Sequence, residues 1–109
     1  MDIIWSKDAG DELFEIISFI KYNSGKIIAN NIYDKINKEV EKASKNASGR
    51  RIAPLLRNFG INHVHQFNVN TWAIFYKVEN NRMEILSIID QRRNLEEILY
   101  NKIIEGKIV

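Results

Sequence analysis

The spacing of apolar residues changes once along this chain, near Ile61, and this change restricts the possible folds more than any other feature. Before Ile61, apolar side chains recur every three or four residues, which is typical of amphipathic helices. After it they alternate with polar ones, which is typical of strands. At 109 residues the chain is shorter than the roughly 150 residues of a usual domain, so we expect a single α+β domain, residues 1–109.

The first half predicts one strand and two helices. Ile3-Ile4-Trp5 is a short apolar run, and Ser6 or Asp8 can cap the helix that follows. The core stripe of that helix is Ala9, Leu13, Ile16, Ile17 and Ile20. Asn23-Ser24-Gly25 ends it, and a second helix from about Lys26 carries a narrow apolar seam, namely Ala29, Tyr33, Ile36, Val40, Ala43 and Ala47. The short link between them predicts an antiparallel αα-hairpin, and residues 44–51, followed by Pro54, predict a connection.

The second half predicts an antiparallel meander of three strands and a last helix. The strands are expected at 61–69, 71–79 and 82–90, with tight turns at Asn70-Thr71 and Asn80-Asn81, because asparagine tolerates a positive φ. Asn94 with Glu97 resembles a capping box before a short apolar stripe. The expected fold is an N-terminal strand, an αα-hairpin, a three-stranded meander and a C-terminal helix, with the helices packed on one face of the sheet.

Composition excludes several classes of protein. The chain has no cysteine, so it forms neither a disulfide nor a thiolate metal site. Its start has no signal peptide, and no apolar run approaches the ~18 residues of a membrane span, so we expect a soluble cytoplasmic protein without a membrane partner. Phosphate-loop, dinucleotide and hydrolase motifs are absent, and no third ligand accompanies the two histidines, so we predict no cofactor and no metal.

Two groups of polar residues are candidates for function. His63 and His65 are expected to share one strand face, either as an acid/base pair for phosphodiester cleavage or as a half-buried structural pair. The basic residues Arg50 and Arg51 lie in a run without acids that fits a phosphate or an acidic partner, or serves only solubility. In Asp90-Gln91-Arg92-Arg93 the arginines can grip a phosphate or a carboxylate, or form an ion pair at the helix entry.

Together these segments resemble the RelE/ParE toxin superfamily of bacterial type II toxin–antitoxin modules. The resemblance covers nearly the whole chain. It is carried by Ser6-Lys7-Asp8-Ala9, Ala29, Gly49-Arg50-Arg51-Ile52, Trp72-Ala73-Ile74-Phe75-Tyr76-Lys77-Val78 and Glu84-Ile85-Leu86-Ser87-Ile88-Ile89-Asp90-Gln91-Arg92-Arg93. The last two segments match the family pattern of an aromatic residue, Arg, an aliphatic pair and Tyr, then a strand ending in His-x-x-Arg.

The RelE-like branch implies ribosome-dependent cleavage of mRNA by basic side chains on the sheet. In this chain Ala73 stands where the family pattern has arginine. Asp90 stands where the pattern has the histidine or lysine that closes the last strand. Losing one electrostatic stabiliser of a transition state costs about 3 kcal/mol. A nuclease would then depend on His65, Arg92 and Arg93, with Lys77 as a further cation.

The ParE-like branch resembles the chain more closely, in its long helical hairpin and its Ile-Leu-Ser-Ile-Ile strand. This resemblance implies a growth-inhibiting toxin of a plasmid-stabilisation type, which poisons DNA gyrase by binding and needs no catalytic residues. It also implies a cognate antitoxin, and we expect that antitoxin to cover Phe14, Phe19, Tyr22, Arg50 and Arg51. The alternatives are an mRNA endoribonuclease that acts on the ribosome with mRNA, and an inactive toxin fold that only binds the antitoxin.

Overall fold

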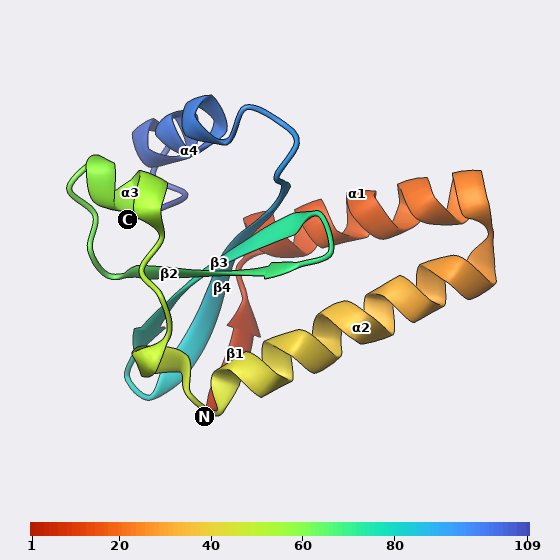
Figure 1. Ribbon diagram of the computed structural model, residues 1–109, viewed down its shortest axis with the longest axis horizontal. Coiled ribbons are helices and arrows are strands. Elements are labelled where there is room, and N and C mark those ends of the chain that lie inside the picture. The colour runs from red at the N-terminus through yellow and green to blue at the C-terminus, as the bar shows by residue number, and fades with distance from the viewer.

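The computed structural model describes all 109 residues and confirms the predicted order of strands and helices (Figure 1). The elements are β1 (Asp2–Trp5), α1 (Lys7–Ser24), α2 (Lys26–Ser44), a 3-10 turn (Ala47–Gly49), α3 (Pro54–Asn58), β2 (Val64–Val69), β3 (Trp72–Glu79), β4 (Arg82–Asp90) and α4 (Leu95–Ile104). No helix is both long and apolar enough to cross a lipid bilayer.

The strands form one four-stranded sheet in the order β1-β4-β3-β2. β1 pairs in parallel with β4, and the other neighbours are antiparallel. Asn70, Asn80 and Asn81 have φ values of 52°, 53° and 57°. These positive values agree with the tight turns that the asparagines predicted. The register shifts within β4, because Phe75 lies opposite Ser87 whereas Tyr76 lies opposite Ile85. A bulge of this kind bends a strand locally and increases its twist.

Helices cover both faces of the sheet, which corrects the expectation of helices on one face only (Figure 1). The α1–α2 hairpin packs on one face, where Leu13, Ile36 and Val40 meet sheet residues such as Ile74. On the other face Leu56 of α3, Leu99 of α4 and the C-terminal Ile108 pack on Phe75 and its neighbours. Because β2 to β4 are apolar on both faces, one helical layer would leave the second face in water.

The helical hairpin forms largely as its sequence predicts. Ser6 caps α1, since its Oγ accepts a hydrogen bond from Ala9 N at 3.1 Å. Gly25 joins the helices at a φ of 93°, a value that residues with a Cβ rarely adopt. The seam of α2 is buried except at Tyr33, and Ala47, which was expected in the same helix, lies in the 3-10 turn beyond it.

The connection before the sheet differs from the prediction in two places. Pro54 begins the short helix α3, because proline lacks an N–H and is tolerated at the first helical position. Residues 61–63 were expected to open the first strand, but β2 begins at Val64. The chain reverses at Gly60, which has a φ of 81°, and Ile61 N–H donates back to Leu56 O at 3.0 Å, so these residues belong to the turn after α3.

Candidate functional site

A groove of about 640 Å³ lies between α1 and the ends of β3 and β4, and it gathers three of the predicted site residues. Its apolar floor includes Ile16, Ile20 and Trp72, and Phe19, Arg92 and Arg93 also line it. The groove forms because the bulged end of β4 runs beside α1, while the turn after Asp90 carries the arginines. Carboxylates line it as well, namely Glu12, Glu15 and Asp90, so the groove offers apolar surface beside charges of both signs.

The two arginines of the groove differ in their electrostatic environment. Arg92 Nη2 lies 2.6 Å from Asp90 Oδ2, and Arg92 Nε donates to Asp90 Oδ1 at 3.0 Å. The hydrogen bonds from Arg92 hold the pKa of Asp90 below its ordinary value and raise the pKa of Arg92. Arg93 is exposed and makes no ion pair. Arg93 is therefore the arginine that is available to a ligand.

Glu12, at the inner end of this groove, was not a predicted site residue. Its Oε1 accepts hydrogen bonds from Ser87 Oγ at 2.8 Å and from Ile88 N–H at 3.1 Å, so it fixes the bulge of β4. Its Oε2 lies 2.9 Å from Nζ of Lys102, which also binds Asp8. The only sequence indication was the spacing of Asp8 and Glu12, four residues apart beside the core stripe.

His65 lies elsewhere, in the core of the sheet, where 8% of its surface is exposed. Its Nδ1 is 2.9 Å from Arg50 O, and its ring stacks on Tyr76 with centroids 5.0 Å apart. His63 precedes β2, is exposed, and bonds Val109 O through Nε2 at 2.7 Å. The expectation that the two histidines share one strand face is therefore wrong, because His63 belongs to the turn after α3.

The candidate nuclease residues are not brought together. The register places His65 of β2 opposite Tyr76 of β3. Asp90 of β4 lies opposite Trp72, which in turn lies opposite Val69 of β2, so Asp90 is level with Val69 across the sheet. His65 and Val69 are four residues apart on β2, which separates the two places by about 13 Å along the strand. Ala73 is fully buried on the α4 face. No three His, Asp or Glu side chains lie close enough to hold a metal ion.

The predicted partner-binding aromatics are exposed on the α1–α2 hairpin, which projects beyond the sheet in Figure 1. Phe14 is 73%, Phe19 70% and Tyr22 91% exposed. They do not form one cluster: Phe14 lines a small apolar groove with Tyr33, and Phe19 lines the larger groove. Of the predicted basic residues, Arg50 lies over the Phe67 ring at 5.3 Å, and Arg51 is exposed.

One family model matches most of the chain, and a solved structure shares its fold. Residues 3–95 match the sequence model of a family described as the ParE toxin of the type II toxin–antitoxin system parDE. Among solved structures, a chain of the chromosomal ParDE TA system from P. aeruginosa superposes with a TM-score of 0.67 at 17% sequence identity. That match covers 83% of this chain and 95% of the other, and it indicates a shared fold. No curated protein matches the sequence significantly.

Proposed function

Because this chain belongs to the ParE toxin family of type II toxin–antitoxin systems, we propose that it is the toxin of a two-gene module and that a cognate antitoxin neutralises it. The fold shared with a ParDE system supports this proposal. The exposure of Phe14, Phe19 and Tyr22 along α1 supports it as well, because a helix that exposes several large apolar side chains often contacts another protein. We assign these aromatics, with Arg50 and Arg51, to the antitoxin contact.

We propose further that the toxin inhibits DNA gyrase by binding and cleaves no bond itself. The observation that carries this proposal is the separation of His65 from Arg92 and Arg93. General acid–base catalysis needs its groups within hydrogen-bond reach of the same reacting atoms. His65 is instead held by Arg50 O, and Asp90 neutralises Arg92. A toxin that acts by binding needs no such constellation.

The alternative is a RelE-like mRNA endoribonuclease, which would use His65, Arg92 and Arg93. One observation favours it: Arg93 is exposed without an ion pair and can meet a phosphate. A third possibility is a toxin fold that has lost its activity and acts only by binding the antitoxin.

Two assays on the same purified protein separate these functions. We expect inhibition of DNA supercoiling by gyrase and intact mRNA in a translating extract. A nuclease would give the reverse, and Arg93→Ala would then abolish cutting while Arg82→Ala, at the opposite end of β4, would not. Cut mRNA with normal supercoiling would refute the gyrase proposal. Inactivity in both assays, with retained antitoxin binding, would favour the third possibility.

A further inference from the structure

Acidic and basic residues are unevenly distributed along this chain. No acidic residue lies between Glu41 and Glu79, although the whole chain has 14 acidic residues and 16 lysines and arginines. In that stretch Lys77 pairs with Glu79 and Glu84. The remaining cations of the stretch form no ion pair within the chain, and we call them the basic edge: Lys42, Lys45, Arg50, Arg51 and Arg57.

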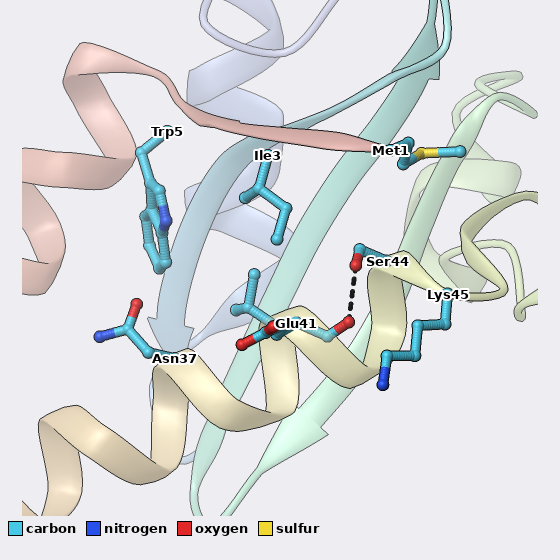
Figure 2. A pocket seen from close by; sticks show the side chains of 8 residues that line it. Met1, Ile3, Trp5, Asn37, Glu41, Ser44 and Lys45 are labelled. Carbon is cyan, nitrogen blue, oxygen red and sulfur yellow. Dashed lines mark hydrogen bonds between the residues drawn. The ribbon is translucent and has the colours of Figure 1, made fainter.

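The basic edge begins at the end of α2 and continues along β2. Lys42 lies in the last turn of α2, and Lys45 comes just after the helix, where its side chain extends away from β1 (Figure 2). The segment then runs along β2 to α3 (Figure 1), and Gln66 N–H donates to Arg51 O at 3.0 Å. Arg57 lies in α3. The cations therefore follow one another along one segment that borders the sheet.

The residues of the basic edge are accessible to a ligand. All of them are exposed except Arg50, which is half-buried. The Arg50 guanidinium lies over the ring of Phe67, 5.3 Å from its centroid. Contact with the face of a ring leaves the N–H groups at the rim of a planar guanidinium free to donate. A group of cations without acids among them attracts a ligand that carries several negative charges.

The surface around these cations favours a nucleic acid over an acidic peptide. From Lys42 to Asn58 no large apolar side chain is exposed, whereas α1 exposes Phe14, Phe19 and Tyr22. A peptide that orders on binding needs apolar contacts to offset its lost conformational entropy. A phosphate backbone needs none, because cations that neutralise it release its condensed counterions.

The aromatic rings near the basic edge favour a duplex over a single strand. Single strands bind by stacking their bases on free aromatic rings, in addition to charge. The Phe67 ring is 7% exposed and lies beneath Arg50. Phe59, just after α3, already packs against Tyr100, with ring centroids 5.8 Å apart. A duplex, whose bases are already stacked, presents only its phosphates to such a surface.

We propose that the basic edge binds the phosphate backbone of duplex DNA without regard to its sequence. The choice of DNA rests on the proposed function, because an inhibitor of gyrase acts where duplex DNA is held. Contacts from lysine and arginine to phosphates position a protein on a duplex and carry no sequence information. The toxin would then contact both its target enzyme and the DNA on which that enzyme acts.

Fluorescence anisotropy with a short labelled DNA duplex tests the proposal on the full chain. The antitoxin is left out, because Arg50 and Arg51 are also assigned to its contact. We expect dissociation constants of about 1–100 μM at physiological salt, equal for two duplexes of unrelated sequence. If each of the five cations neutralises one phosphate, the slope of log K against log salt concentration is about −4.5. The affinity should then fall roughly 500-fold between 50 and 200 mM salt.

Paired substitutions separate the basic edge from the net charge of the protein. Arg51→Gln combined with Arg57→Gln removes two contacts, so the slope should fall to about −2.7 and the affinity at 50 mM salt at least tenfold. Lys21→Gln combined with Arg82→Gln removes the same charge from the hairpin and from the start of β4. Both of these residues are exposed and unpaired, and this control should keep the native slope. If the first variant fails to fold, Lys42→Gln combined with Lys45→Gln replaces it.

Several results would overturn the proposal. Equal losses of affinity in the edge variant and in the control would show that net charge alone attracts DNA. Tighter binding of a single strand or of duplex RNA would overturn the assignment to duplex DNA, and so would binding of a glutamate-rich peptide in its place.

The supercoiling assay keeps this proposal distinct from the proposed function. Inhibition of gyrase by a toxin that does not bind DNA by itself would overturn the basic edge and leave the gyrase proposal standing. Salt-dependent DNA binding that the edge variant loses, without inhibition of gyrase, would support the basic edge and contradict the gyrase proposal.

Discussion

Tyr76 lies in the middle of the sheet, fully buried, and its hydroxyl donates a hydrogen bond to Ala47 O at 2.7 Å. Its ring also stacks on His65 and meets Phe67 edge-on at 5.9 Å. Burial raises the pKa of Tyr76 from 10.0 to about 12, although the charge of Arg50 lowers it slightly. This one residue ties the 3-10 turn after α2 to the sheet, and its ionisation opposes folding.

The first prediction at this scale concerns Tyr76→Phe. The substitution leaves the buried Ala47 carbonyl without its donor, so we expect the free energy of unfolding at pH 7 to fall by about 1–2 kcal/mol. The protonated hydroxyl stabilises the fold below pH 10, and the native protein loses that contribution as pH rises from 10 toward about 12. The loss amounts to about 3 kcal/mol and should be absent in the variant.

Chemical denaturation at several pH values measures both effects. Tyr22→Phe is the matched control, because Tyr22 is almost fully exposed and its loss should change nothing measurable. Equal alkaline losses in the native protein and in Tyr76→Phe would show that Tyr76 ionises as freely as a surface tyrosine.

At the scale of elements, an ionic cluster attaches α4 to α1. Lys102 of α4 is buried and binds both Asp8 and Glu12 of α1, and Lys107 Nζ lies 3.4 Å from Asp8 Oδ1. Burial acts to raise the pKa of Asp8, but the hydrogen bonds and charges of Lys102 and Lys107 outweigh it and hold the pKa below its ordinary value. For Lys102, burial acts to lower the pKa, and its two carboxylate partners raise it overall.

We predict that Lys102→Met lowers the free energy of unfolding at pH 7 by about 2 kcal/mol, because it leaves the part-buried Glu12 without a cation and Asp8 with Lys107 alone. A carboxyl whose pKa is lowered in the folded protein stabilises the fold at pH values above its ordinary pKa of 3.8. That contribution is lost as the pH falls through the pKa that the carboxyl has in the folded protein. The difference in unfolding free energy between Lys102→Met and the native protein should therefore shrink below about pH 4.

Lys7→Met is the control, since the Lys7–Asp11 pair is exposed and contributes little. Urea unfolding measures both variants. An equal loss of unfolding free energy in Lys102→Met and Lys7→Met would contradict a special role for Lys102.

At the scale of the whole molecule, the hairpin and the sheet present different surfaces to partners. The hairpin extends away from the sheet in Figure 1, and both of its helices carry apolar side chains that nothing covers. A chain that folds on binding can cover the exposed side chains of both hairpin helices together. The face that α3 and α4 cover is occupied by the protein's own core.

We predict that replacing both Phe14 and Phe19 with serine weakens binding of the antitoxin at least 100-fold, because two aromatic side chains lose their burial in the complex. The stability of the free protein should change by less than about 1 kcal/mol, since both side chains are mostly exposed. Ile104→Ser on α4, also exposed, is the control for a general loss of apolar surface. An unchanged dissociation constant with an intact fold would exclude the two phenylalanines as anchors.

The candidate site was predictable only in part. Exposure of Phe14, Phe19 and Tyr22 followed from their place outside the helical stripe, since a helix face is a local property. The groove that joins Phe19 to Arg93 was not predictable, because these residues are far apart in the sequence and meet only after β4 packs beside α1. The position of His65 opposite Tyr76 likewise depends on strand register. The sequence does not show where β2 begins, so it could not show that His63 lies outside the strand that holds His65.

The sequence by itself determined the main elements and their order, except for the short helix α3, because the preferences that define them act over a few residues. Ser6 and Asn94 cap their helices, and Asn70, Asn80 and Asn81 adopt the positive φ that their turns require. Only the tertiary structure decided that β1 pairs in parallel with β4, that helices cover both faces, and that Lys102 meets Asp8 across 94 residues of chain. These contacts depend on which surfaces meet when the layers pack, and local spacing carries no information about residues so distant in the chain.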